Sequence, residues 1–174
     1  HTLEYLTRAY LQTYQCAEAA ATAQRWRDTA PGNLDAHTTL GALAGDVLSL
    51  CEADARFCVI PPTGGDVQLG IALIRDGNWP LAACVLARAA AQDDASAEAH
   101  AWFGEALARI GRPAEARPHF LKATALAPQS PLPWLLLGLH DLGQQQTDTA
   151  TEALLHARGL DPTKLPPLPI NEIA

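Results

Sequence analysis

The chain contains no methionine, few aromatic residues and no long apolar run, and the last two shortages exclude classes of protein. Aromatic side chains make up 6% of the 174 residues, and β-branched residues seldom occur in runs, so the composition favours helix over strand. The most leucine-rich stretch, Pro133 to Leu139, is soon broken by His140, Asp141 and Gly143. It is therefore far shorter than the roughly 20 apolar residues that cross a bilayer. We expect a helical protein with no membrane span.

Basic clusters and paired cysteines are missing as well. Twelve Lys and Arg stand against nineteen Asp and Glu, with a formal net charge of -7, so nothing complements a phosphate backbone and no nucleic-acid partner is expected. Cys16, Cys51, Cys58 and Cys84 form no Cys-x-x-Cys pair, which argues against zinc and thioredoxin-like sites. We predict buried thiols, because Cys51 and Cys58 lie about two helical turns apart, too far for a disulfide unless the helix breaks between them.

The apolar share of 48% and the charged share of 18% are typical of a globular protein with a real core. Because the chain begins at His1 and has no methionine, we expect a processed protein or an excised piece. The compartment stays open between cytoplasm, periplasm and secretion.

A repeat with a constant period is the main feature that is present. Gly70, Gly104 and Gly138 are evenly spaced, and each is followed at fixed offsets by an alanine, a bulky apolar residue, another alanine and a helix-ending residue. These landmarks are Ala82, Leu86, Ala89 and Asp94, then Ala116, Phe120, Ala123 and Pro128, then Ala150, Leu154, Ala157 and Pro162. Small residues at helix crossings let two backbones approach while large ones fill the neighbouring gaps. The spacing predicts stacked helix pairs.

Trp134-x-x-Leu137-Gly138, Ala116-x-x-x-Phe120 and the closing prolines resemble the tetratricopeptide repeat, a helix-turn-helix unit of about 34 residues whose length matches the interval between the glycines. The resemblance implies an all-α superhelix, a solenoid of about five units and about ten helices, in which the first two units are degenerate. We place the units at residues 1–33, 34–62, 63–96, 97–130 and 131–164, followed by an extended proline-rich tail at residues 165–174.

Three local features carry further expectations. Gly77, Gly111 and Gly143 fall in the turns within helix pairs, where a left-handed residue is wanted. Pro118 lies about five residues into its helix and should bend it or leave a carbonyl unpaired. Asp141 stands where the repeat pattern has a large apolar residue. The alternative that this helix is shifted and turns Leu142 inward therefore stays open.

Motifs for chemistry are weak. The stretch Thr63 to Asp66 is glycine-rich, but it follows no strand and precedes no Gly-Lys-Ser/Thr, so we interpret it as a loop before a helix. Histidines are spread one per helix without metal-ligand spacing and are expected to be solvated or partly packed; they are His37, His100, His119, His140 and His156. No nucleophile motif appears. We predict a non-enzyme with no catalytic residues, no metal and no cofactor.

The first helices of a stacked array line a concave channel, and proteins that resemble this one usually bind an extended peptide or partner helix there. The family's groove positions correspond to Gly64, Val67, Ile71, Ile74 and Arg75 in the third unit and to Glu98, Ala101, Glu105, Ala108 and Arg109 in the fourth. In the fifth unit they are Leu132, Leu135, Leu139, Leu142 and Gly143. The lysine and asparagine clamp that the family uses for acidic tails is absent, since its places hold Thr38, Thr39, Ala42, Gly64 and Gln68. The resemblance implies an apolar groove oriented by Arg75, Glu105 and Arg109.

Four leucines of the fifth unit form a stripe that the repeat itself does not cover. Leu132, Leu135, Leu139 and Leu142 recur at helical spacing, whereas Trp134, Leu137 and Gly138 pack inside the stack. A bound peptide, a second copy of the chain or the chain's own tail can cover the stripe. We expect the tail from Leu165 to be extended, either against apolar surface or as a linker to a further domain.

The function predicted from these observations is a non-catalytic protein-protein interaction scaffold that binds an apolar peptide or partner helix in its concave groove. One alternative is an accessory region that presents substrate to a larger enzyme. Another is a self-association module, as a homodimer formed through the groove, the last repeat or the C-terminal tail.

Overall fold

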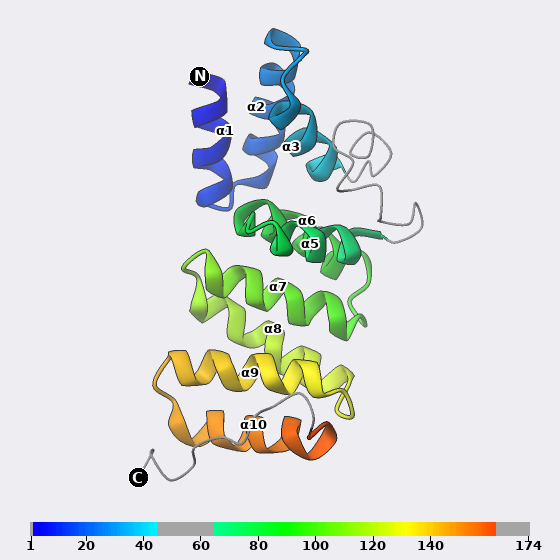
Figure 1. Ribbon diagram of the computed structural model, residues 1–174, viewed down its shortest axis with the longest axis vertical. Helices are drawn as coiled ribbons and strands as arrows, with labels where there is room; N and C mark the ends of the chain where they lie inside the picture. The colour runs from blue at the N-terminus through cyan, green and yellow to red at the C-terminus, as the bar shows by residue number, and fades with distance from the viewer. Residues whose placement is uncertain (1, 45–64, 163–174) are drawn as a thin grey trace.

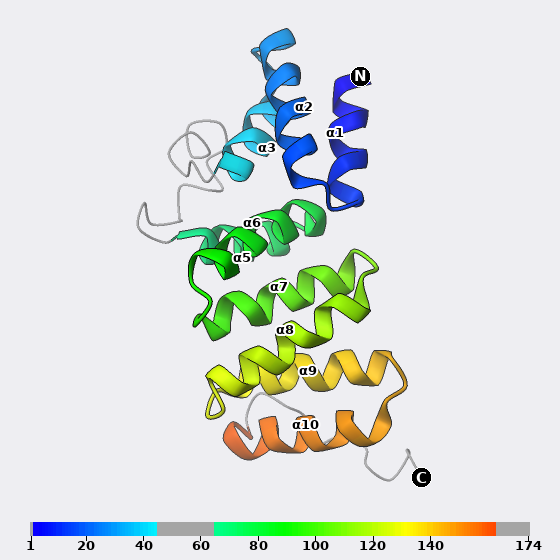
Figure 2. The same cartoon turned by 180° about the vertical axis from the view of Figure 1, so that it is seen from behind.

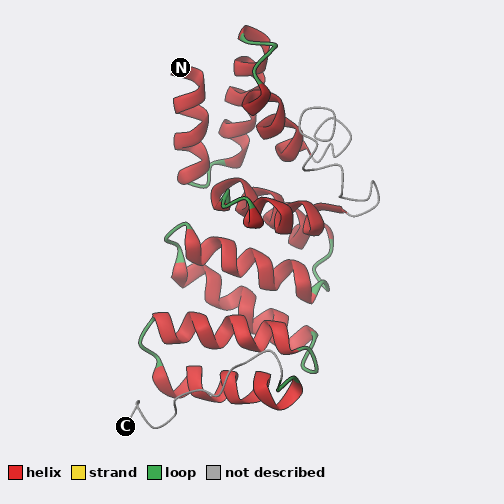
Figure 3. Cartoon of the chain, in the orientation of Figure 1, coloured by secondary structure: helices red, strands yellow, loops and turns green. Residues whose placement is uncertain are grey.

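The computed structural model describes residues 2–44 and 65–162, and within these two ranges all regular structure is helical (Figure 3). The helices are α1 Thr2–Gln12, α2 Cys16–Thr29, α3 Leu34–Ala44, α5 Gly65–Arg75, α6 Trp79–Gln92, α7 Ala97–Arg109, α8 Pro113–Leu126, α9 Pro131–Gly143 and α10 Thr147–Leu160. The predicted all-α class is confirmed. Cys51, Cys58, Gly64 and the tail from Leu165 lie outside the described residues.

Helix pairs follow one another along the long axis of the molecule (Figure 1; Figure 2). Each of the pairs α5–α6, α7–α8 and α9–α10 is an internally packed hairpin, and α6 packs on α7 as α8 packs on α9. The first helices also touch directly, α5 with α7 and α7 with α9. This successive displacement of one hairpin past the next is the solenoid that the constant period predicted.

A close contact between glycine and a bulky side chain recurs in each of these hairpins. A Cβ added to Gly104 would lie 2.8 Å from the ring of Phe120, and one added to Gly138 would lie 2.6 Å from Leu154. Gly70 meets Leu86 in the same way. Because the bulky partner is buried in every case, the absence of a side chain at the glycine sets how near the two helices can lie.

The turns within hairpins share one backbone conformation. A residue of positive φ follows the first helix in every described hairpin, and it is Tyr14, Gly77, Gly111 or Gln145. The next N–H then donates to a carbonyl five residues back, as in Asn78 to Leu73 and Arg112 to Leu107. The prediction for the last turn was wrong, because Gly143 ends α9 and Gln145 takes the left-handed position.

Helix α8 continues through Pro118 without interruption. Pro118 has no N–H for the carbonyl of Ala114 four residues earlier. Both residues are exposed, so water can reach this carbonyl, and the helix tolerates the proline.

The N-terminal helices are oriented differently from the rest, since α1 and α2 run along the long axis whereas α5 to α10 lie across it (Figure 1). A disulfide joins Cys16 at the start of α2 to Cys84 in α6, with the two Cα atoms 5.7 Å apart. The prediction of a buried thiol was therefore wrong for both residues. They are 68 positions apart in sequence, and they meet where the N-terminal helices pack against α6.

Tyr14 strengthens the same junction. The guanidinium of Arg112 lies 4.8 Å from the centre of the Tyr14 ring, and the ring of Phe103 lies 6.1 Å away. Burial raises the pKa of Tyr14 to about 12, although the positive charge of Arg112 opposes the shift. The neutral phenol is thus part of the packing between the first hairpin and α7.

Arg88 fastens the end of α3 to the stack. Its guanidinium donates to both carboxylate oxygens of Asp66, at 2.6 and 2.7 Å, and to the backbone carbonyls of Ala42 and Leu43 near the end of α3. One side chain of α6 therefore connects α3, α5 and α6.

The glycine contact can be tested by substitution. Gly104→Ala should lower the free energy of unfolding by about 1–3 kcal/mol, because the buried Phe120 ring cannot move away without strain. Urea denaturation measures the change. Gly159→Ala is the matched control, since a Cβ there meets nothing within 4 Å. Equal stability of the two variants would contradict the proposed role of the contact.

The disulfide should contribute to stability mainly through the unfolded chain. For a bridge closing a loop across 68 positions, the chain-entropy relation gives about 4 kcal/mol. Addition of a reductant should lower the midpoint of thermal unfolding of the wild-type chain. The double variant Cys16→Ser/Cys84→Ser should unfold at that lower temperature with or without the reductant. A reductant-insensitive wild type would show that the bridge is not closed in solution.

Candidate partner-binding surface

The first helices α5, α7 and α9 lie next to one another, and the predicted groove residues are distributed along them. In α5, Val67 and Ile74 are half-buried and pack against the core, Ile71 is half-buried, and Arg75 at the helix end is exposed. The apolar side chains of α5 are thus partly used by the fold itself.

In α7 the predicted residues divide into buried and exposed ones. Ala101 has no exposed surface, so its side chain cannot contact a partner directly. Glu105 and Arg109 form an ion pair of 2.8 Å one turn apart, and the Arg109 guanidinium lies 5.3 Å from the centre of the Trp79 ring. This stacking holds a charged group at the end of α7.

Leu139 and Leu142 of α9 are the most exposed apolar side chains of the predicted set. Leu139 is 50% exposed and Leu142 44%, while Leu132 and Leu135 are half-buried. These four residues are called the α9 stripe below. Other large apolar side chains are also exposed among the described residues. On the second helices α8 and α10 they are Leu121, Leu126 and Leu155, and on α1 and α3 they are Tyr5, Leu6 and Leu34.

A buried ion pair fixes which side of α9 faces outward. Asp141 is fully buried and accepts from Arg117 of α8 through both oxygens, at 3.0 and 3.2 Å. The equivalent positions in α5 and α7 are the buried Leu73 and Leu107. Asp141 therefore points inward as the repeat pattern requires, and the alternative in which Leu142 turns inward does not occur.

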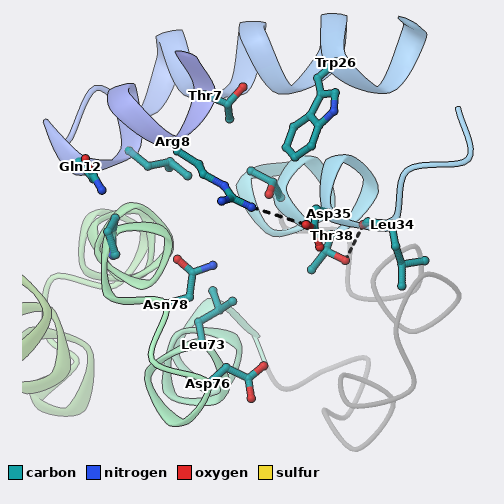
Figure 4. A pocket seen from close by; sticks show the side chains of 13 residues that line it. Thr7, Arg8, Gln12, Trp26, Leu34, Asp35, Thr38, Leu73, Asp76 and Asn78 are labelled. Atoms are coloured by element: carbon teal, nitrogen blue, oxygen red, sulfur yellow. Dashed lines mark hydrogen bonds and ion pairs between the residues drawn. The ribbon is translucent and has the colours of Figure 1, made fainter. Parts of the chain in front are cut away.

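A polar-rimmed pocket that the sequence did not reveal lies between the first hairpin, α3 and α5. Its volume is about 400 Å³, and Figure 4 shows Arg8 of α1 reaching toward Asp35 of α3. The side chains around it are Thr7, Arg8, Leu11, Gln12, Trp26, Leu34, Asp35, Thr38, Thr39, Leu73, Asp76, Asn78 and Pro80. The sequence identified Thr38 and Thr39 only as the residues that occupy positions of the family's lysine and asparagine clamp.

Two of the histidines form a pair that their sequence separation did not suggest. The Nδ1 atoms of His100 in α7 and His119 in α8 are 3.0 Å apart, so one ring donates and the other accepts. His100 is buried and its Nε2 lies 3.2 Å from the carbonyl of Asp94. No group of three potential metal ligands gathers among residues 2–44 and 65–162. The pair connects α7 with α8.

Loss of one partner of the buried ion pair should have unequal effects. Arg117→Met should cost about 3–5 kcal/mol, because it leaves the carboxylate of Asp141 buried without a cation. Asp141→Leu should cost much less, since Arg117 is about one-third exposed and can turn to water. Chemical denaturation measures both, and the reverse order would contradict the inward placement of Asp141.

Acid should destabilise the fold below the ordinary histidine pKa of 6.5. Burial, followed by the charge of His100, lowers the pKa of His119, and burial lowers the pKa of His140. The unfolded chain therefore takes up protons at a higher pH than the folded chain. The contribution is complete above pH 6.5 and decreases as the pH falls toward the lowered values.

Thermal unfolding between pH 7.5 and 5 tests this dependence. His119→Gln should reduce the decrease in unfolding temperature, whereas His156→Gln, at an exposed residue of α10, should leave it unchanged. An unchanged pH profile in the His119 variant would contradict the assignment. Lys122, Asp94 and Glu115 also act on the His119 ring and are the same in both variants.

Comparison with known proteins supports the repeat. Residues 97–140 match the sequence model of the tetratricopeptide repeat family, and none of the curated proteins matches the chain in sequence. None of the helices described is long and apolar enough to cross a membrane.

Solved structures with a similar fold cover nearly the whole chain. One described as the crystal structure of MamA is 19% identical, with a TM-score of 0.52 over 91% of this chain and 96% of the other. MamA 41-end from Desulfovibrio magneticus RS-1 is 18% identical, with a TM-score of 0.54 over 94% and 95%. Pseudomonas aeruginosa pilF is 16% identical, with a TM-score of 0.51 over 91% and 75%. Residues 97–140 therefore match a tetratricopeptide repeat, and the chain has the all-helical solenoid fold of these solved structures.

Proposed function

We propose that the chain is a non-catalytic interaction scaffold that binds an apolar peptide or partner helix across the first helices α5, α7 and α9. The observation that carries the proposal is the exposure of Leu139 and Leu142 on α9, on a helix whose rotation is held by the pair Asp141 and Arg117. A rigid helix that keeps leucines in water offers a ready surface to a partner.

Covering this surface contributes favourable free energy to the binding of a partner. Complete removal of a leucine side chain from water is worth about 1.5–3 kcal/mol. Leu139 and Leu142 are about half exposed, and Leu132 and Leu135 are less exposed. Because part of each side chain is already buried, covering the α9 stripe contributes less than the value for full burial, several kcal/mol in all. A gain of about 1.4 kcal/mol in binding free energy corresponds to a tenfold change in affinity.

Polar groups at the far ends of α5 and α7 supply orientation. Arg75 is exposed at the end of α5, and Arg109 is held by Glu105 and Trp79 at the end of α7. Since both helices run in the same sense within the repeat, these two cations stand on one edge of the surface. They can fix the direction in which a bound segment lies.

Two alternatives make different use of the same surface. A substrate-presenting region of a larger enzyme would bind the partner as a substrate and hand it to a separate catalytic domain. A self-association module would cover the α9 stripe with a second copy of the chain, which light scattering detects as a concentration-dependent mass.

The variant Leu139→Asp/Leu142→Asp should abolish capture of partners from an extract of the source cell. Leu121→Asp/Leu155→Asp is the control, because these leucines are 43% and 45% exposed on α8 and α10 and the change in charge is the same. Both variants should keep the helical circular dichroism of the wild type. Proteins captured equally by both variants would refute binding through α9, and a mass halved only in the α9 variant would favour self-association.

A further inference from the structure

Helix α9 has a neighbouring first helix on one flank only. Among the described residues α7 packs against both α5 and α9, whereas α9 packs against α7 as its single neighbour of this kind. Its residues are more exposed than those at the equivalent positions of α7. Ala101 is fully buried where α9 has the half-buried Leu135, and Glu105 is half-buried where α9 has the exposed Leu139. The open flank of α9 leaves room for one more segment beside the α9 stripe.

The chain leaves α10 beside the beginning of this stripe. Trp134 near the start of α9 stacks on His156 near the end of α10, with the ring centres 4.2 Å apart. Residues 163–174 follow α10 in sequence and lie outside the described residues. At roughly 3.3–3.6 Å per extended residue, the step from Pro162 to Leu165 covers about 10 Å. This reach is about the diameter of a helix, so Leu165 can arrive at the first turn of α9.

The composition of the residues that follow suits the side of a helix. Pro166, Pro167 and Pro169 have no N–H and favour polyproline II, an extended conformation with three residues per turn and no internal hydrogen bonds. The N–H and C=O groups of α9 are paired within the helix, so its flank offers side-chain contacts rather than main-chain hydrogen bonds. A proline-rich segment has few N–H groups to satisfy and therefore loses little by lying there.

The spacing of the apolar side chains matches as well. Leu165 and Leu168 are one polyproline II turn apart, so they lie on the same side of the segment at a distance of about 9 Å. Leu135 and Leu142 are two helical turns apart on α9, which corresponds to about 10 Å. The leucines of an extended segment can therefore contact leucines of the stripe in succession.

We propose that residues 165–174 of this chain lie along the α9 stripe in an extended conformation and compete with the partner for it. The inference rests on the proposed scaffold function and adds a regulation of the same surface. The apolar contacts come from Leu165, Leu168, Ile170 and Ile173. A linker this short gives an effective concentration in the millimolar range, so a contact too weak to hold a free peptide still keeps the stripe covered. A partner has to displace the segment, which lowers its apparent affinity.

Leucine methyl NMR of the full chain tests whether the stripe is covered. The variant Leu168→Asp/Ile170→Asp, called the tail variant, removes apolar contacts of the segment without shortening the chain. A soluble gadolinium chelate should broaden the methyl signals of Leu139 and Leu142 strongly in the tail variant, whereas these signals should keep most of their intensity in the wild type. Leu121, which is 43% exposed on α8, is the matched control and should broaden equally in both. Circular dichroism confirms that the tail variant is folded.

A fluorescein-labelled peptide of residues 163–174 tests the competition by fluorescence anisotropy. An effective concentration of about 1 mM against an intrinsic Kd of about 0.1 mM leaves roughly one stripe in ten open, so the peptide should bind the tail variant about tenfold more tightly than the wild type. Adding Leu139→Asp/Leu142→Asp to the tail variant should abolish this binding. Adding Leu121→Asp/Leu155→Asp instead should leave it unchanged, because these leucines lie on α8 and α10.

Two results would overturn the inference. One is equal gadolinium broadening, or an equal Kd for the peptide, in the wild type and the tail variant; the scaffold function would then still stand, because the stripe would be open to a partner. The other is protection that increases with protein concentration together with a doubled mass in light scattering, since the segment would then cover a second copy of the chain. Failure of the scaffold function is distinct. Neither chain would then capture a partner through the α9 stripe, while the NMR and peptide measurements keep their expected outcomes.

Discussion

The contact between a glycine of the first helix and a bulky side chain of the second sets the geometry of the three hairpins from α5 to α10. Gly104 against Phe120 and its counterparts at Gly70 and Gly138 set the distance between the two helices of a hairpin. Because the same contact recurs at a constant interval, each hairpin has nearly the same shape and stacks on the next in the same way. The adjacent first helices α5, α7 and α9 result from that repetition, and with them a continuous surface for a partner.

Polar pairs then decide how each helix is rotated within this framework. Hydrophobic packing alone would accept several rotations of a helix as rich in leucine as α9. The buried carboxylate of Asp141 accepts only the one in which Arg117 reaches it. Leu139 and Leu142 stay in water as a consequence. Arg88 has a similar effect at the other end, where it binds Asp66 and the last carbonyls of α3.

The first hairpin departs from the regular stack, and the pocket lies where this hairpin meets α3 and α5. The bridge between Cys16 and Cys84 and the stacking of Tyr14 on Arg112 hold α1 and α2 against α6 and α7. Arg8, Asp35 and Leu73 are among the residues that line the pocket at this junction. Disulfides in general form and persist in oxidising compartments.

The sequence by itself determined the features that repeat. The helix pairs, the close glycine contacts and the outward leucines of α9 could be read from the constant spacing, because they depend on residues within one hairpin or on helical periodicity. The tertiary structure decided the features that occur once. The left-handed turn at Gln145, the burial of Ala101, the histidine pair, the disulfide and the pocket depend on which elements meet. Residues 68 positions apart carry no local signal of that meeting, since contacts between distant segments arise only when the whole array has packed.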